Sequence, residues 1–338
     1  MFKDVLNHLL NRQDLSSEQM LETMRQVMGG KLTSVQISAF LIALRMKSET
    51  VNEIAAAATV MRELSTKVTV RNTASLVDTC GTGGDGIQTF NVSTVSAFVA
   101  AAAGAKVAKH GGRSVSSTCG SADVLEAFGV NVNQTPEQVA KSVDEIGIGF
   151  MFAPNHHSAM KHAAPVRKEL GVRTLFNLLG PLTNPANARR QVMGVFDKAL
   201  TGKLAQVLHK LGSEHVLVVH GADGMDEISF TGDTFVAELK DGKITEYVLN
   251  PKQFGLKIHQ LKDIQIQNAQ ESKAMILDVL NGKHGAARDI VLLNAGAAIY
   301  VAGLQASIHG GVEHAAKMID SGEAAKKLQQ LVQKSNHD

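Results

Sequence analysis

The sequence is poor in cysteine and in aromatic residues, and its charges nearly cancel. Its 2 cysteines, Cys80 and Cys119, lie far apart and in no spacing typical of a metal site or a redox motif. A disulfide framework is therefore not expected, and a reducing cytoplasm fits the sequence. The formal net charge of +2 gives no reason to expect nucleic acid or an anionic membrane as a partner.

Long apolar stretches are also lacking. The N-terminus does not have the apolar core of a signal peptide. The longest apolar run, around residues 99–103, is far too short to cross a bilayer. With 44% hydrophobic and 20% charged residues, the composition is typical of a soluble globular protein. A length of 338 residues predicts two domains or one large α/β body.

Residues 1–70 carry only helical patterns. Apolar residues recur at helical spacing, as in Met20, Met24 and Val27, and Gly29-Gly30 is a predicted helix end. Three capping boxes predict helix starts, and they pair Ser16 with Gln19, Thr33 with Gln36 and Thr50 with Glu53. This region is therefore predicted to be an all-helical unit.

From Ser75 onward, strand signals alternate with helical ones. Strands are predicted at 76–77, 105–108 and 216–219, and a hairpin at 235–248 turns at Asp241-Gly242. Helices are predicted after the glycines at 81–86, at 121–128 and from about residue 272 onward. Strands that alternate with helices predict a largely parallel sheet with helices on its faces.

The densest signal is the run Gly81-Thr82-Gly83-Gly84-Asp85-Gly86, between a predicted strand and a predicted helix. Glycines let the backbone approach a ligand, and a helix N-terminus offers unpaired N–H groups, so the run predicts phosphate binding. It also matches the dinucleotide pattern, but no acidic residue lies between Asp85 and Asp123 to bind a ribose, which disfavours a nicotinamide cofactor. No Walker A pattern occurs. A plain tight turn is the alternative.

Two further polar runs follow. Asn91–Thr94 begins the next helix, where its side chains can cap the helix or bind phosphate oxygens and magnesium. Residues 109–113, followed by serines at 114, 116, 117 and 121, combine a lysine, a forked arginine and hydroxyls, which suits a pyrophosphate. The alternative for this second run is a solvated basic turn, and His110 can equally be a structural hydrogen bonder.

Carboxylates and a second basic segment complete the candidates. Asp226-Glu227 follows a strong predicted strand, and adjacent carboxylates there suit magnesium, with a plain polar loop as the alternative. Arg167 can bind a substrate carboxylate through a bidentate salt bridge. His156 and His157 lie nearby, without the spacing of a zinc protease.

Together these segments resemble the anthranilate phosphoribosyltransferase family. The resemblance rests on GTGGD at 81–85, NVST at 91–94, KHGGRSVSS at 109–117, GSADVLEAFG at 120–129, MKHAAPVRKELGVRTLFNLLGPLTNP at 160–185 and DE at 226–227. It implies an α/β fold with a small all-helical domain, a large α/β domain with a central, mostly parallel sheet, and a cleft between them. The small domain is expected to hold residues 1–70 and a returning segment at about 165–188. The large domain is expected to hold 71–164 and 189–338, and two chains are expected to form a homodimer through the small domains.

The resemblance also implies the site residues. Those expected to bind phosphoribosyl pyrophosphate are Gly81, Gly84, Asp85, Thr89, Asn91, Val92, Ser93, Thr94, Lys109, His110, Gly111, Gly112, Arg113, Ser114, Val115, Ser116, Ser117 and Ser121. Two magnesium ions are expected, one on Ser93 and Glu227 and one on Asp226 and Glu227. Gly81, Gly112 and Arg167 are expected to face anthranilate, and no protein nucleophile is expected.

The implied activity is transfer of a phosphoribosyl group to the amine of anthranilate, a step of tryptophan biosynthesis. One residue departs from the family pattern KHGNR, whose Asn contacts anthranilate, because this chain has Gly112 there. Loss of one such hydrogen bond costs about 1 kcal/mol, enough to raise KM and to leave room for a different acceptor. The alternatives are a related phosphoribosyltransferase or nucleoside phosphorylase with another acceptor, and a non-catalytic relative that binds nucleic acid.

Overall fold

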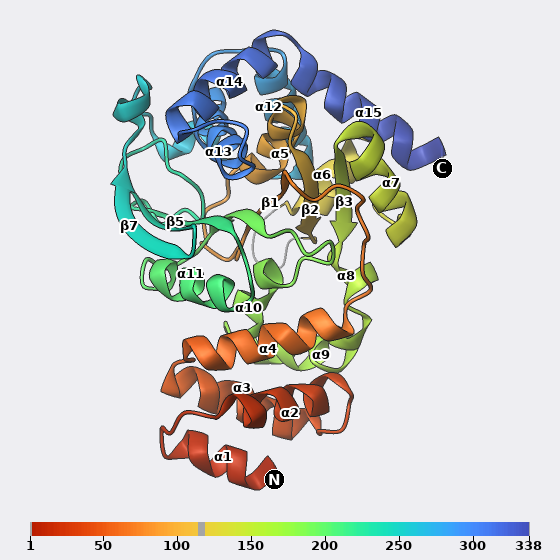
Figure 1. The fold of residues 1–338 in the computed structure, drawn as a ribbon, viewed down its shortest axis with the longest axis vertical. Helices are drawn as coiled ribbons and strands as arrows, with labels where there is room; N and C mark the ends of the chain where they lie inside the picture. The colour runs from red at the N-terminus through yellow and green to blue at the C-terminus, as the bar shows by residue number, and fades with distance from the viewer. Residues whose placement is uncertain (1, 114–118, 338) are drawn as a thin grey trace.

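The computed structural model describes residues 2–113 and 119–337. The N-terminal part is a helical bundle, at the bottom of Figure 1, and an α/β body lies above it. The bundle begins with α1 (Phe2–Leu10), α2 (Ser17–Met28), α3 (Ser34–Lys47) and α4 (Val51–Leu64). The predicted fold class, a helical domain joined to a larger α/β domain with a mostly parallel sheet, is confirmed.

The three predicted capping boxes are present. At Ser16, Thr33 and Thr50 the hydroxyl accepts from a backbone N–H three residues later, and the later side chain accepts from the N–H of the cap residue. Each helix start thereby satisfies two backbone donors within the chain. The third box also ties helices together, because its Glu53 pairs with Lys47 at 2.9 Å and accepts from the Leu15 N–H at 2.9 Å.

Within the described residues, one seven-stranded sheet has the order β3-β2-β1-β4-β5-β6-β7. Neighbouring strands from β3 to β5 are parallel, and β6 and β7 continue antiparallel. The strands are β1 (Leu76–Gly81), β2 (Lys106–Gly111), β3 (Ile148–Phe152), β4 (Arg190–Gly194), β5 (His215–Gly221), β6 (Thr234–Lys240) and β7 (Lys243–Leu249).

The predicted strands match β1, β2 and β5, and the predicted hairpin is β6 and β7. Its two turn residues, Asp241 and Gly242, have φ of 50° and 72°, as a two-residue hairpin turn of this hand requires. Strands β3 and β4 are not predicted from the sequence. They are short, and neither is flanked by a turn signal as strong as the glycine run after β1.

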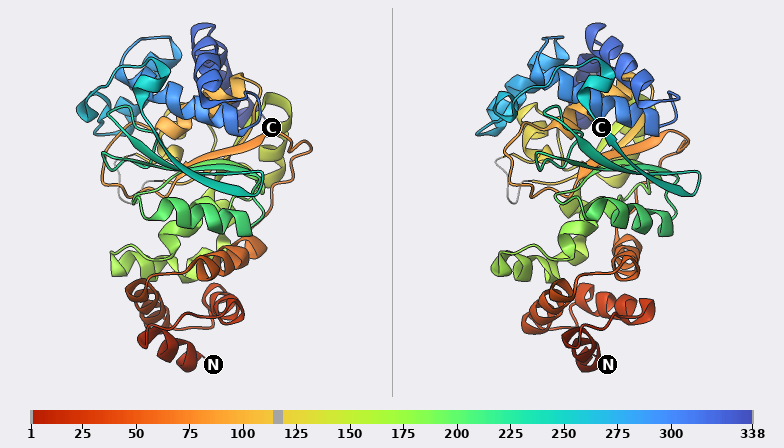
Figure 2. Two further views of the ribbon diagram at one scale, coloured as in Figure 1. Left: turned by 60° about the vertical axis from the view of Figure 1, so that its left-hand side comes forward. Right: turned by 90° about the vertical axis from the view of Figure 1, so that its left-hand side faces the viewer.

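Helices cover both faces of the sheet (Figure 2). One face carries α5 and the C-terminal helices, and the other carries α11 and the helical bundle. Side chains along β5 alternate accordingly, with Leu217 and Val219 in the first core cluster and Val216 and Val218 in the second. The body's longer helices are α5 (Val92–Ala102), α6 (Ser121–Ala127), α7 (Pro136–Ile146), α11 (Leu200–Lys210), α12 (Ala269–Leu280), α13 (Ala286–Val301), α14 (Ile308–Asp320) and α15 (Glu323–His337), with short 3-10 turns η3 (Pro251–Phe254) and η4 (Leu261–Ile264).

A segment between β3 and β4 returns to the bundle. It comprises α8 (Ala153–His156), η1 (Ser158–His162), α9 (Ala164–Leu170), α10 (Phe176–Leu179) and η2 (Gly180–Leu182). Helix α9 contacts α3, and α10 contacts α4, so Val166 and Phe176 share one core cluster with the bundle helices. The division of the chain into two domains with the expected boundaries stays a prediction.

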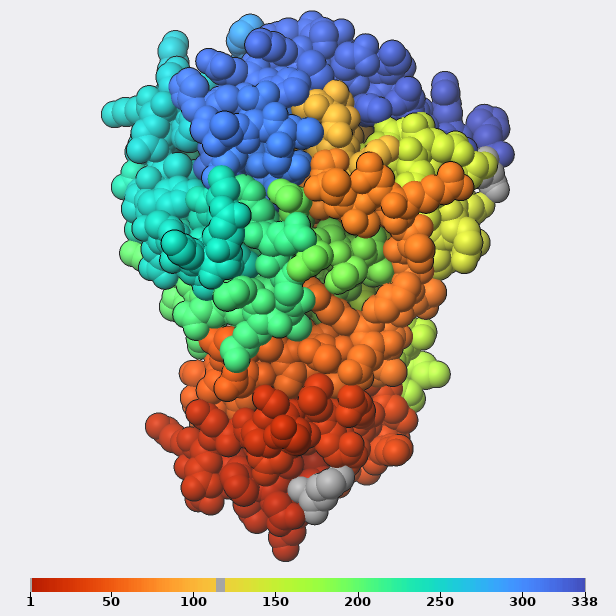
Figure 3. Space-filling view, viewed as in Figure 1, coloured from red at the N-terminus to blue at the C-terminus, as the bar shows by residue number. Residues whose placement is uncertain are grey.

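The bundle and the body are also joined at the surface. The segment between α4 and β1 runs along the outside from one to the other (Figure 3). Inside, the second core cluster continues from the bundle through α11 to Met193 on β4 and Val216 on β5. No helix of the described residues is long and apolar enough to cross a membrane.

Candidate active site

The candidate site residues gather at the carboxyl edge of the sheet. Strands β1, β2, β4 and β5 end there at Gly81, Gly111, Gly194 and Gly221. Strands β2 and β3 lie on one side of β1, and β4 to β7 follow on its other side. The strand order therefore reverses between β1 and β4. In open parallel sheets, ligands bind in the crevice at such a reversal.

Asp226 lies directly over that reversal. A Cβ atom added to Gly194 would stand 1.5 Å from the Asp226 carbonyl oxygen, and one added to Gly81 would stand 2.2 Å from the Asp226 Oδ2. Gly194 must therefore be glycine for the loop between β5 and β6 to lie across the sheet edge, and a side chain at Gly81 would displace the Asp226 carboxylate. Sequence reasoning singles out Gly81 through its motif, but it misses Gly194, which ends an unpredicted strand.

The glycine-rich loop after β1 is built on glycine conformations. Gly83, Gly84 and Gly86 have φ of 63°, 74° and 79°, in the left-handed region. The Gly83 N–H donates to Asp226 Oδ2 at 2.8 Å, so the loop lies beside the carboxylate pair. The guanidinium of Arg173, in the returning segment, donates to the Gly84 carbonyl.

Asp85 and Thr89 occupy the outer part of the same loop. Asp85 Oδ1 accepts from the Ile87 N–H at 3.0 Å, which shapes the turn. Thr89 forms an isolated antiparallel bridge with Gln265. Asp85 is thus placed by a local turn, and Thr89 is placed by pairing with a segment far along the chain.

The start of α5 meets the carboxylate pair. The Ser93 N–H donates to Glu227 Oε1 at 3.1 Å, and Ser93 Oγ accepts from Lys109 Nζ at 3.2 Å. The positive end of the helix dipole and the lysine both favour the carboxylate at this point. Ser93, Lys109 and Glu227, three of the predicted residues, therefore form one connected group.

Asn91 holds the position before α5 but its side chain does not cap that helix. Its Oδ1 accepts from Ser272 Oγ at 2.7 Å, and its Nδ2 donates to the Cys119 carbonyl at 3.1 Å. The capping alternative is therefore wrong for Asn91. Its side chain instead ties the start of α5 to the start of α12 and to the segment that enters α6.

Three carboxyl groups, those of Asp85, Asp226 and Glu227, lie close together at the site. Burial, and next the repulsion from Asp85, raises the pKa of Asp226 to about 7. Burial, and next the repulsion from Asp226, raises the pKa of Glu227 to about 8. Burial lowers the pKa of Lys109, although Asp78 opposes this shift. Carboxylates held this close gain most from a bound cation.

The oxygen donors of Ser93, Asp226 and Glu227 are hard ligands that suit magnesium. Within residues 2–113 and 119–337, no group of three or more His, Cys, Asp or Glu side chains is arranged to hold a metal ion. Magnesium would therefore need water or ligand phosphate oxygens in addition, which is its usual mode of binding in phosphate sites. The residues present fit that mode.

A buried hydrogen-bond network lies next to Lys109 in the sheet. Asp78 Oδ2 accepts from Asn184 Nδ2 at 2.7 Å, and Asp78 Oδ1 accepts from the His110 N–H at 3.2 Å. Asn184 Nδ2 also donates to the Ala108 carbonyl at 2.9 Å. Asp78 thus joins β1, β2 and the end of the returning segment. Sequence reasoning misses it because a single polar residue within a strand carries no motif.

The basic run after β2 is only partly placed at the carboxylate pair. Arg113 points to α6, where it pairs with Asp123 at 3.0 Å and with the Glu126 carboxylate. Ser121 Oγ donates to the Gly112 carbonyl at 3.4 Å. Two acids therefore already balance the Arg113 charge, while the predicted residues Ser114, Val115, Ser116 and Ser117 lie outside the described residues.

Arg167 lies on α9 of the returning segment. Its guanidinium lies over the Phe176 ring at 5.4 Å, and burial lowers its pKa. Among the described residues it has no hydrogen-bonded or ion-paired partner. A half-buried guanidinium in this state can accept a carboxylate at low desolvation cost.

His110 at the end of β2 and His156 and His157 in the returning segment form a buried group. Burial lowers the pKa of His110 to about 3 and that of His157 to about 4, so both rings are neutral at pH 7. The His156 ring bonds the Thr66 carbonyl at 3.0 Å, and the rings of His110 and His157 lie 5.1 Å apart. The role of His110, in donor binding or as a structural hydrogen bonder, stays a prediction.

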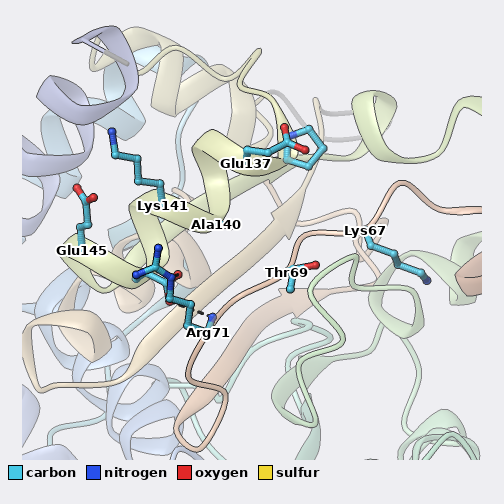
Figure 4. A pocket seen from close by; sticks show the side chains of 9 residues that line it. Lys67, Thr69, Arg71, Glu137, Ala140, Lys141 and Glu145 are labelled. Atoms are coloured by element: carbon cyan, nitrogen blue, oxygen red, sulfur yellow. Dashed lines mark hydrogen bonds and ion pairs between the residues drawn. The ribbon is translucent and has the colours of Figure 1, made fainter.

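A surface pocket of about 390 Å³ lies away from these residues, between the segment 67–71 and α7 (Figure 4). None of the predicted site residues lines it. Its cations face acids, with Arg71 Nε at 3.8 Å from Asp144 Oδ2. A second hollow of about 310 Å³ is lined by Gly86 and residues 265–267, at the outer side of the glycine-rich loop.

The architecture belongs to a known class. Residues 3–65 match the family described as "Glycosyl transferase family, helical bundle domain", and residues 73–325 match its "a/b domain". The two matches follow each other along the chain and together cover most of it. The fold and the two matches thus define a two-part glycosyl transferase.

The relatives narrow this class. The "Anthranilate phosphoribosyltransferase" of Methylobacillus flagellatus is 64% identical over 97% of this chain and 96% of its own length, and that of Thiobacillus denitrificans is 61% identical over 98% and 96%. The crystal structure of anthranilate phosphoribosyltransferase from Thermus thermophilus has a TM-score of 0.93 at 42% identity, covering 98% of this chain and 99% of that one. The Saccharomyces cerevisiae enzyme "in complex with PRPP and Mg" has a TM-score of 0.90 at 28% identity, covering 99% and 98%. The chain belongs to the anthranilate phosphoribosyltransferase family.

The raised pKa values predict how stability depends on pH. In the unfolded chain Asp226 and Glu227 lose their protons near pH 4, whereas in the folded protein they keep them to about 7 and about 8. Between these limits the folded state binds more protons, so the metal-free protein loses stability as the pH rises. Glu227→Gln should remove part of this loss, and its unfolding midpoint should exceed that of the wild type by more at pH 8 than at pH 5.

Denaturant unfolding in the presence of a chelator measures both midpoints. Glu137→Gln is the control, because Glu137 is an exposed residue on α7. An equal difference between Glu227→Gln and the wild type at the two pH values would show that Glu227 is already ionised in the metal-free protein.

Proposed function

We propose that this protein transfers the phosphoribosyl group of phosphoribosyl pyrophosphate to the amine of anthranilate, in tryptophan biosynthesis. The products are N-(5-phosphoribosyl)anthranilate and pyrophosphate. The observation that carries the proposal is 64% identity, over 97% of the chain, to an enzyme of that name. The arrangement of the glycine-rich loop, the start of α5 and the carboxylate pair around one strand reversal supports it independently.

The donor is proposed to bind across this edge of the sheet. The backbone N–H groups at the start of α5 and in the glycine-rich loop would hold its phosphates. Lys109 adds a fixed positive charge, because its Nζ is held between the Thr79 carbonyl and Ser93 Oγ. Two magnesium ions are proposed, one held by Ser93 and Glu227 and one by Asp226 and Glu227. When bound, magnesium would neutralise negative charge on the pyrophosphate.

The chemistry is a direct displacement at the anomeric carbon of the ribose. The anthranilate nitrogen forms the new bond to that carbon, the bond to the pyrophosphate oxygen breaks, and the amine proton leaves to solvent. An aromatic amine is nucleophilic as it stands, so the protein does not need to supply a nucleophile. Its residues contribute by aligning the two substrates and by stabilising the charge that develops on the leaving group.

The acceptor is proposed to lie between Gly81 and Arg167. Arg167 is the half-buried guanidinium without a partner among the described residues, and it would pair with the anthranilate carboxylate. Gly81 presents backbone rather than a side chain at the end of β1. Gly112 leaves the position of the family's Asn side chain empty.

A homodimer formed through the helical bundles is also proposed. Exposed apolar side chains on α1 and α3 support it, namely Leu10, Val35 and Met46, which are 66%, 78% and 73% exposed. A cytoplasmic location is inferred from the phosphorylated substrates and from the free thiols of Cys80 and Cys119.

The activity is tested by the loss of anthranilate fluorescence in the presence of phosphoribosyl pyrophosphate, with magnesium and with a chelator. Rapid loss that requires magnesium is expected. The double variant Asp226→Asn, Glu227→Gln should lose at least about 100-fold in rate, because it removes both charged metal ligands. If the double variant keeps its rate and its magnesium dependence, the assignment of the metal ligands is wrong. If the folded wild type binds phosphoribosyl pyrophosphate but leaves anthranilate unchanged, the acceptor is another amine.

Gly112 gives a second prediction. A Cβ atom added there meets no atom of the described residues within 4 Å, so a side chain can be introduced. Gly112→Asn should lower the KM for anthranilate about five-fold, since one recovered hydrogen bond contributes about 1 kcal/mol. Gly112→Ala is the matched control, because it adds the Cβ without the amide, and steady-state kinetics compares the two. Equal KM values for Asn and Ala would contradict the proposed contact.

A further inference from the structure

The carboxylate pair sits on a loop that must be held in place by other residues. Asp226 and Glu227 lie between β5 and β6, in a stretch of irregular backbone. Irregular backbone has no repeating ladder of hydrogen bonds, so the position of the two carboxylates depends on the side chains that bond this loop. Such a loop keeps a metal-binding geometry only if its backbone is fixed on both sides of the pair.

Asn294 fixes the backbone on the far side of the pair. This side chain is on α13 and is 2% exposed. Its Oδ1 accepts from the Ile228 N–H at 2.9 Å, while its Nδ2 donates to the Ile228 carbonyl at 3.0 Å and to the Ile290 carbonyl at 2.9 Å. Because the oxygen and the nitrogen serve opposite partners, the amide can take only one orientation. The residue that follows Glu227 is therefore tied to a buried helix.

Asp223 fixes the other side. Its Oδ1 accepts from the Met225 N–H at 3.1 Å. Its Oδ2 accepts from the hydroxyls of Ser229 at 2.7 Å and Thr231 at 2.6 Å. One carboxylate thus bonds residues on both sides of the pair and closes the loop into a fixed turn. Within the described part of the chain, the side-chain hydrogen bonds of Asp223 and Asn294 go to this loop and to α13, not to the glycine-rich loop or to α5.

We propose that Asn294 and Asp223 are positioning residues that hold Asp226 and Glu227 in the arrangement that binds magnesium. The inference rests on the proposed function, because it assigns these two residues to the metal site of that reaction. They act through the backbone of the loop and do not touch the substrates. Residues that orient metal ligands in this way change metal affinity or activity by roughly 10–100-fold when they are removed.

The test compares Asn294→Ala with a control, Asn336→Ala, at an exposed position. Asn336 on α15 makes similar bonds away from the site, because its Nδ2 donates to the Gly129 carbonyl and to the Val332 carbonyl four residues earlier, both at 2.8 Å. Binding of Mn²⁺ to the protein with phosphoribosyl pyrophosphate, without anthranilate, is followed by electron paramagnetic resonance. Asn294→Ala should weaken Mn²⁺ binding about ten-fold or more and raise the half-saturating magnesium concentration in the assay. Asn336→Ala should bind Mn²⁺ as the wild type does.

A second pair of variants keeps the test decisive if Asn294→Ala does not fold. Asp223→Ala removes all three bonds of Asp223, whereas Asp223→Asn keeps an acceptor for the Met225 N–H, and the facing hydroxyls can turn to accept from its amide. The Ala variant should lose Mn²⁺ affinity, and the Asn variant should recover most of it. In both series the KM for anthranilate should stay within about two-fold of the wild type, since these residues act on the loop and not on the acceptor.

The outcomes separate this inference from the proposed function. If the wild type with phosphoribosyl pyrophosphate binds no Mn²⁺, or if the double variant Asp226→Asn, Glu227→Gln binds it equally well, the proposed metal site itself fails. If the wild type binds Mn²⁺, the double variant does not, and the folded Asn294 and Asp223 variants match the wild type, the positioning role is overturned. A lower unfolding temperature with unchanged Mn²⁺ affinity would likewise reduce both residues to a structural role.

Discussion

The close approach of Asp226 to the ends of β1 and β4 is the contact on which the site depends. A side chain at Gly194 would overlap the Asp226 backbone, and one at Gly81 would overlap its carboxylate. With glycine at both positions, the loop after β5 crosses the sheet edge where the strand order reverses. That crossing brings Asp226 to the Gly83 N–H and Glu227 to the start of α5. If this loop were displaced by the width of a side chain, the carboxylates would lose their hydrogen bonds to the glycine-rich loop and to the start of α5.

The buried carboxylate pair lowers the stability of the metal-free protein at neutral and higher pH, and it offers a site for a cation. Burial raises the pKa of Asp226 and Glu227, so ionising them costs free energy in the metal-free protein, and a bound cation would offset this cost. Burial also lowers the pKa of Lys109, which lies beside this pair. The structural support lies beneath the surface, in Asp78 and Asn184 under Lys109 and in Asn294 and Asp223 around the loop. In the proposed site, these residues would orient the groups that bind the donor and the metal.

The sequence predicts those elements whose interacting residues lie a few positions apart in the chain. The capping boxes at Ser16, Thr33 and Thr50 and the hairpin turn at Asp241-Gly242 depend on residues a few positions apart, and all are present. Gly194, Asn294 and Asp78 were missed because their partners lie far along the chain, and a lone glycine, amide or carboxylate within a strand or helix forms no motif. The pairing of Arg113 with α6 and the unused cap at Asn91 show the same limit, since residue type predicted a polar contact but not its partner. The ligands assigned to each site residue stay predictions.

The most direct measurement is calorimetric binding of phosphoribosyl pyrophosphate with magnesium to Gly194→Ala. The added Cβ must displace the Asp226 backbone, and a shift of about one ångström at such a site can cost about 100-fold. Gly232→Ala is the control, because Gly232 lies in the same loop and a Cβ there meets no described atom within 4 Å. The account predicts that folded Gly194→Ala loses about 100-fold in affinity while Gly232→Ala binds normally. Wild-type affinity in folded Gly194→Ala would contradict the claim that the close packing of Asp226 against Gly81 and Gly194 organises the site.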